Sequence, residues 1–227
     1  VSVAAMLAAC GGGFDGETDL SGARGSLMYN PPQRVTALSA TEFRDRLAAT
    51  ASGQSMLAVA GAPRCGVSVH YIEYGTVGGA SETTNASGAL MVPTGDAAAC
   101  GGPRPVVLYG HGTTTDRAYN IADFTDAARP GASEGLLVVA PNYAGYDASR
   151  LAYHPYLNAD QQSKEMLDAL TAARKALPRV GGQDGGKLLV TGYSQGGHVA
   201  MATHRALQAA GQPVTASAPM SGPYALA

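Results

Sequence analysis

The chain is poor in charged residues and lacks a long hydrophobic segment. Charged residues make up 14% of its 227 residues, against roughly 25% in a typical globular protein. The 15 Lys and Arg residues nearly balance the 17 Asp and Glu residues, and no run of like charges marks a tail, so nucleic acid is not expected as a partner. No apolar run approaches the roughly 20 residues that span a bilayer, which excludes a polytopic membrane protein.

The hydrophobic content of 45% is enough for one large domain with a sizeable core. Short apolar runs followed by turn residues alternate with segments that have apolar residues at helical spacing, and this order predicts an α/β fold with a mostly parallel sheet covered by helices on both faces. We expect strands at 67–77, 86–93, 106–109, 136–140, 187–191 and 214–218. We expect helices at 159–177 and 197–210, a short lead-in helix that starts near Ser39 or Thr41, and an irregular crossover between 111 and 136.

The first ten residues resemble the end of a secretion signal. Residues 1–9 are apolar and uncharged, and they end in small residues directly before Cys10. The segment Leu7-Ala8-Ala9-Cys10 is also similar to the lipobox of bacterial lipoproteins, in which the cysteine is lipidated. We therefore expect a signal remnant with a lipobox at 1–10, a flexible linker at 11–33 and the folded domain at 34–227. The protein would then be exported and either held at the membrane of the cell envelope by a lipid on Cys10 or secreted. A frayed apolar end with an incidental cysteine is the alternative.

The other two cysteines are candidates for a disulfide. Export would bring Cys65 and Cys100 into an oxidising compartment. If the strands at 67–77 and 86–93 form an antiparallel hairpin, the start of the first and the end of the second lie together, and the two cysteines with them. Two free buried thiols are the alternative.

Two Gly-x-Ser-x-Gly motifs occur, and their contexts differ. Ser133 lies in a loop that leads into a strand, whereas Ser194 lies between the strand at 187–191 and the helix at 197–210. A nucleophile elbow requires such a strand-to-helix turn, with small neighbours that let the serine hydroxyl project. Ser194 is therefore the candidate nucleophile, and a serine that caps an ordinary or nucleotide-binding turn is the alternative.

The residues around Ser194 can also provide an oxyanion hole. The backbone N–H of Gln195 begins a helix and can donate to a developing oxyanion. The glycine-rich turn after the strand at 106–109 ends at the same edge of the sheet, so Gly112 or Thr113 can provide the second N–H.

These motifs resemble the α/β-hydrolase fold, specifically bacterial lipoprotein-type carboxylesterases and secretory lipases with Gly-Tyr-Ser-Gln-Gly-Gly elbows. The resemblance covers about residues 67–224. It implies that His111 shapes the oxyanion loop and that the loop at 140–147 borders the substrate pocket. Candidate substrate-binding residues are Tyr143, Tyr146 and Tyr193. Tyr153, His154 and Tyr156 would extend this wall, or the tyrosines would only pack loop against helix.

The family's triad runs Ser, then Asp or Glu, then His, and the chain has no Asp or Glu after Ser194. His198 and His204 fall in a predicted helix. The acid and base are therefore expected beyond residue 227, with the last strands of the domain. Alternatively, His111 or His154 would act as base, oriented by Asp147 or Asp160.

The sequence thus predicts a serine ester hydrolase that forms an acyl-enzyme on Ser194 from a small-molecule ester, with no cofactor and no metal site. A lipid-anchored binding protein of the same fold, a serine peptidase and a plain scaffold are the alternatives.

Overall fold

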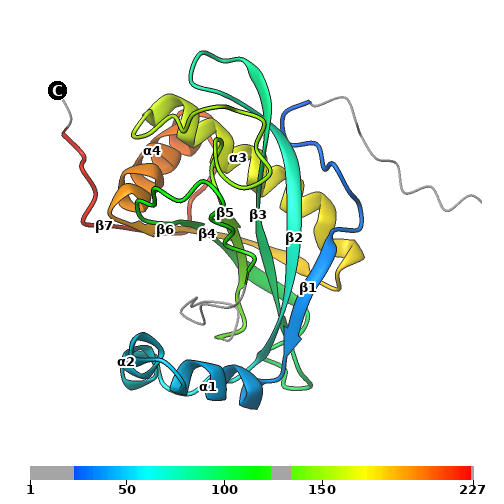
Figure 1. Ribbon diagram of the computed structural model, residues 1–227. Helices are drawn as coiled ribbons and strands as arrows, with labels where there is room; N and C mark the ends of the chain where they lie inside the picture. Colours follow the sequence, from blue (N-terminus) through cyan, green and yellow to red (C-terminus); the bar gives the residue numbers. More distant parts are fainter. Residues whose placement is uncertain (1–22, 124–133, 226–227) are drawn as a thin grey trace, which may run out of the picture.

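The computed structural model describes residues 23–123 and 134–225, which form a seven-stranded sheet with helices packed against it (Figure 1). The signal remnant with Cys10, most of the predicted linker, Ser133 and part of the predicted crossover lie outside the described residues. Among the described residues, no helix has the length and apolar character needed to cross a membrane.

The strand order is β1-β2-β3-β5-β4-β6-β7. The elements are β1 Gln33–Leu38, α1 Ala40–Ala48, α2 Ala51–Ala60, β2 Gly66–Val77, β3 Thr83–Thr94, β4 Pro103–Gly110, β5 Leu137–Pro141, α3 Ala159–Ala176, β6 Gln183–Tyr193, α4 Gln195–Ala209 and β7 Ala216–Met220. All the strands and helices predicted in the described residues are present, with boundaries shifted by a few residues.

The sheet is mixed. Strands β1, β2, β3 and β5 pair antiparallel, whereas β5, β4, β6 and β7 pair parallel. The expectation of a mostly parallel sheet thus holds from β5 to β7, where the ends of β4 and β6 carry the site. The additional edge strand β1 was not predicted, because its sequence is short and its side chains are mostly exposed.

Two apolar clusters cover the two faces of the sheet. Helices α3 and α4 bury Met166, Leu170 and Val199 in the larger cluster. Helix α1 buries Phe43 and Leu47 in the other, against β2, β3 and β5. Figure 1 shows α3 and α4 together at one end of the molecule and α1 and α2 at the other.

The lead-in helix begins where its sequence predicts. The Ser39 side chain accepts a hydrogen bond from the Glu42 N–H, and the Glu42 carboxylate accepts one from the Ser39 N–H. The two bonds form a capping box at the start of α1. Helix α2 follows at once with Thr50 as its cap. It was not predicted, because most of its side chains are exposed and it has little amphipathic pattern.

The predicted flexible linker is wrong for its described part. Leu27 is buried and bridges to Tyr74 on β2, and the Gly25 amide donates to the Gly75 carbonyl. Arg24 forms an ion pair with Asp168 on α3 at 3.0 Å. These contacts hold the segment on the domain, because they bury its apolar side chain and pair its backbone.

The predicted disulfide is present. Cys65 and Cys100 are bonded, with their Cα atoms 5.5 Å apart. The hairpin supplies the geometry, since Gly66 at the start of β2 pairs with Thr94 at the end of β3.

Candidate active site

Ser194 stands on the turn between β6 and α4. Its backbone has φ 57° and ψ −120°, a combination that costs free energy for a residue with a side chain. The Ser194 N–H donates to the carbonyl of Met220 on β7 at 3.0 Å, which holds the turn. The Ser194 side chain makes no capping bond to α4. The alternative of a capping serine therefore has no support in this geometry, and the hydroxyl is available for other chemistry.

Glycines allow the turn, which we call the elbow (residues 192–197), to lie directly on the end of β4. A Cβ atom at Gly196 would overlap the Gly110 carbonyl oxygen, and one at Gly192 would overlap the Gly196 carbonyl oxygen. A Cβ at Gly110 would lie 2.9 Å from the Tyr143 hydroxyl. The elbow and the strand end therefore pack backbone against backbone.

The glycine-rich turn after β4, residues 110–115, is here called the oxyanion loop, and it reaches Ser194. A Cβ built on Gly112 would lie 3.8 Å from the Ser194 Cβ and 3.5 Å from the Tyr193 carbonyl oxygen. Gln195 is the first residue of α4, where the amides of an α-helix have no acceptor within the helix. The two predicted sources of oxyanion donors thus both lie next to the serine.

His111 is held inside the oxyanion loop. Its ring nitrogens lie 2.6 Å from the Gly112 carbonyl oxygen and 3.1 Å from that of Asn142. The ring stacks on Tyr143 with centroids 4.2 Å apart. These contacts fit the predicted role of shaping the loop, and they engage both nitrogens that a general base would need.

The tyrosines predicted to bind substrate have different environments. Tyr143 is fully buried and donates to the His111 carbonyl at 3.0 Å. The prediction that Tyr143 lines the substrate pocket is therefore wrong, because its side chain is buried and bonds to the backbone of the oxyanion loop. Tyr193 is 57% exposed next to Ser194. Tyr146 donates to the Thr114 carbonyl at 2.6 Å, and Tyr153 bonds to Glu82 at the tip of the β2–β3 hairpin.

A hollow of about 490 Å³ opens beside the oxyanion loop. Its wall contains three threonines of the oxyanion loop and Arg117, which follows that loop. The aromatic side chains of the wall come from the segment after β5. Within this wall, the Tyr156 hydroxyl and Thr113 Oγ1 form a hydrogen bond of 2.9 Å. The lining residues are Thr113, Thr114, Thr115, Arg117, Gly145, Tyr146, His154 and Tyr156.

The other candidate bases and acids are engaged elsewhere. His198 and His204 lie on α4, as predicted, and bond to the Pro223 carbonyl and to Ser217. Asp147 accepts hydrogen bonds from Tyr71 and Ser87, and Asp160 pairs with Lys164 on its own helix. Within residues 23–123 and 134–225, no histidine forms a hydrogen bond to the Ser194 hydroxyl, and no group of three metal-ligating side chains is found.

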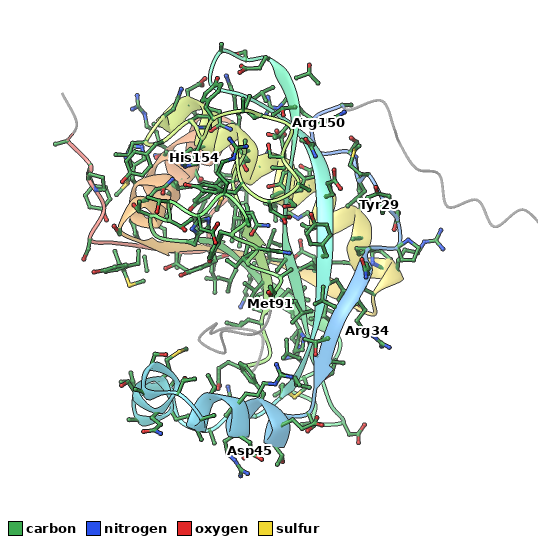
Figure 2. The ribbon with its side chains drawn as sticks, in the orientation of Figure 1. Tyr29, Arg34, Asp45, Met91, Arg150 and His154 are labelled. Carbon is green, nitrogen blue, oxygen red and sulfur yellow. A yellow bond between two sulfur atoms is a disulfide. The ribbon has the colours of Figure 1, made fainter. Side chains whose placement is uncertain are left out.

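Sequence reasoning missed one contact at the site. Gln195 of the elbow is buried and places its side-chain nitrogen 2.6 Å from Nε2 of His154. Figure 2 shows His154 in the dense group of side chains near α3 and α4, at the opposite end of the molecule from Asp45 on α1. Gln195 and His154 are 41 positions apart, and no local sequence pattern predicts such a pair.

Comparison with solved structures gives relatives of this arrangement. The ligand-bound form of the rice cell wall degrading esterase LipA from Xanthomonas oryzae is 36% identical, with a TM-score of 0.78 over 90% of this chain and 52% of that one. A candidate hydrolase from Legionella pneumophila is 26% identical, with a TM-score of 0.71 over 85% of this chain and 52% of that one. No protein-family model and no curated protein matches the chain.

The chain has the α/β-hydrolase fold of these structures. It spans about half the length of the structures that it matches. The α/β-hydrolase fold therefore accounts for the elbow after β6, the oxyanion loop after β4 and the position of both at one edge of the sheet.

Proposed function

We propose that this chain carries the nucleophile and the oxyanion hole of a serine carboxylic ester hydrolase. The main support is the strained backbone of Ser194 together with the position of Gly112 beside it. A protein retains such strain where the site uses it. The 36% identity to an esterase favours ester hydrolysis over the other reactions that the fold supports.

In the proposed reaction, Ser194 Oγ attacks the ester carbonyl carbon while its proton passes to a general base, which later gives it to the leaving alcohol. The carbonyl oxygen becomes an oxyanion. The backbone N–H of Gln195, with that of Gly112 or Thr113, donates hydrogen bonds to the oxyanion. The alcohol then leaves with a proton, and water hydrolyses the acyl-enzyme to release the acid. The hollow lined by Tyr146 and Tyr156 is a candidate for holding one side of the substrate.

The base and acid of the reaction belong to the proposal as well. His111 and His154 have their ring nitrogens in other contacts. We therefore place the histidine and carboxylate that activate Ser194 outside the described residues. We also propose that the protein is exported, since a disulfide such as Cys65–Cys100 persists in oxidising compartments. A lipid anchor on Cys10 stays a prediction from the sequence.

The test is hydrolysis of p-nitrophenyl butyrate by the complete protein and by its Ser194→Ala variant. The variant should lose activity by about 10⁴-fold or more, because the nucleophile is removed. A fluorophosphonate probe should label the wild type at Ser194 and leave the variant unlabelled. Activity that survives Ser194→Ala would overturn the assignment. A wild type that folds, binds esters and neither hydrolyses them nor reacts with the probe would favour a binding protein.

A further inference from the structure

The side chain of Gln195 is buried, although its backbone N–H is a proposed oxyanion donor. The residue is 1% exposed, and its amide nitrogen meets His154 Nε2 at 2.6 Å. Its Oε1 is buried and has no partner among the described residues. The contact with His154 is therefore the hydrogen bond on which this buried amide depends, and leaving a buried polar group unpaired costs about 1 to 3 kcal/mol.

The contacts of His154 define its protonation. Its Nδ1 lies 2.8 Å from the carbonyl oxygen of Ala144, which can only accept a hydrogen bond. Nδ1 therefore carries the proton, and Nε2 accepts from the Gln195 amide. Burial lowers the pKa of His154, which keeps the ring neutral and Nε2 free to accept.

Aromatic rings hold the imidazole in place. The His154 ring lies 4.6 Å from that of Tyr146 and stacks on Tyr143 at 5.6 Å with an interplanar angle of 16°. Tyr143 stacks on His111 and donates to its carbonyl in the oxyanion loop. His154 is therefore connected to both sources of oxyanion donors. It contacts the side chain of Gln195 directly, and it contacts the oxyanion loop through Tyr143.

We propose that His154 is a positioning residue that fixes the first turn of α4 through Gln195 and so sets the oxyanion amide. This inference rests on the proposed ester hydrolysis. His154 does not touch the reacting atoms in this role. It keeps the Gln195 N–H pointing at the oxyanion, and the free energy that it contributes appears in the transition state rather than in substrate binding.

The experiment compares His154→Leu, His154→Gln and Gln195→Met in the complete protein, with p-nitrophenyl butyrate as substrate. His154→Leu should lower kcat by about 10- to 100-fold, since losing a whole oxyanion donor costs about 10²- to 10³-fold. KM should change less than kcat, although His154 also lines the hollow proposed for the substrate. His154→Gln should recover much of this loss, because its amide oxygen can accept from Gln195. The control is His204→Leu, which removes a histidine from the far part of α4 and should leave kcat unchanged.

A double-mutant cycle provides the stricter test. If the two side chains act through one contact, His154→Leu combined with Gln195→Met should lower kcat no further than either change alone. Thermal unfolding of each variant identifies losses that come from unfolding, and His154→Gln retains a readout if His154→Leu fails to fold.

Two kinds of failure are distinguishable. Hydrolysis that depends on Ser194 but keeps its wild-type kcat in His154→Leu would overturn this inference alone, as would additive effects in the cycle. Loss of all activity in His154→Leu, with no recovery in His154→Gln, would make His154 the general base and overturn the positioning role. Absence of Ser194-dependent hydrolysis in the wild type would overturn the proposed function and this inference together.

Discussion

The antiparallel and parallel halves of the sheet are held together in different ways. In the antiparallel half, β2 and β3 pair over twelve residues each, and the Cys65–Cys100 disulfide closes one end of the hairpin. In the parallel half, β4 pairs with β6, and the elbow after β6 packs on the end of β4, where Gly110, Gly192 and Gly196 bring backbone against backbone. The hairpin of the first half is held by long backbone pairing and one covalent bond, whereas the elbow of the second half needs three positions without side chains. We therefore expect the loss of the disulfide to change stability without changing activity, whereas a substitution at the glycines of the elbow should cost the fold and the site together.

The largest effect is expected in the parallel half, for Gly196→Ala. The added Cβ would overlap the Gly110 carbonyl oxygen, which is backbone and cannot rotate away. We expect a loss of about 5 kcal/mol or more in the free energy of unfolding, or no soluble folded protein, because severe overlap in a packed site is among the most destabilising changes. Yield, circular dichroism and urea unfolding measure it.

Gly112→Ala is the matched control. The Gly112 Cβ would find its nearest neighbour at 3.5 Å, which is ordinary contact, so the variant should fold with nearly the wild-type stability. Its added methyl would face Ser194 and should act on turnover instead. Equal stability of the two variants would contradict the close packing of the elbow on β4.

The next effect belongs to the antiparallel half, in the double variant Cys65→Ala and Cys100→Ala. The cysteines are 35 positions apart, and a loop of that length predicts a loss of about 4 kcal/mol in the free energy of unfolding. Activity on a nitrophenyl ester well below the melting temperature should be retained, because the disulfide lies at the amino ends of the parallel strands and Ser194 at their carboxyl ends. In the wild type, a reductant that cleaves the disulfide should lower the free energy of unfolding in urea by a similar amount. A variant that unfolds like the wild type but loses activity would reverse the comparison between the two halves.

Much of the fold could be predicted from the sequence, because its signals are local. Ser194 follows a strand and precedes a helix, and the glycines around it indicate a tight turn. Ser133 shares the motif and lacks that context. The pairing of Cys65 with Cys100 follows from one antiparallel hairpin. Each of these inferences needs only the order of neighbouring elements.

The sequence could not predict the contacts that cross the sheet edge. The sequence indicates that Tyr143 is a pocket residue, yet it has a positive φ of 71°, is fully buried and stacks on His111. The pairing of His154 with Gln195 depends on how the segment after β5 folds back over the elbow. Leu27 reads as part of a linker because one apolar residue among glycines and polar residues carries no periodicity. Long-range packing decides all three.

The smallest effect concerns Glu165 on α3, which faces Tyr74 on β2 of the antiparallel half. This carboxyl of α3 is buried, accepts from Gln161 Nε2 at 3.0 Å and lies 3.5 Å from the hydroxyl of Tyr74 on β2. Burial raises its pKa from 4.5 to about 7, and the charge of Asp168 adds to the shift. The folded protein therefore binds a proton here that the unfolded chain releases between about pH 4.5 and 7.

Because the folded state binds more protons in that window, the stability contributed by Glu165 is complete below about pH 4.5 and falls as the pH rises through about 7. The shift corresponds to a loss of at most about 3 kcal/mol. Glu165→Gln stays neutral and should remove this dependence of stability on pH. Compared with the wild type, the variant should therefore be more stable at pH 8 than at pH 5. Glu82→Gln is the control of opposite sign, since a hydrogen bond from Tyr153 lowers the pKa of that exposed carboxyl. Urea unfolding from pH 4 to 8 measures both variants. An unchanged slope in Glu165→Gln would mean that the carboxyl is charged in the folded protein and that α3 packs on β2 around an ion.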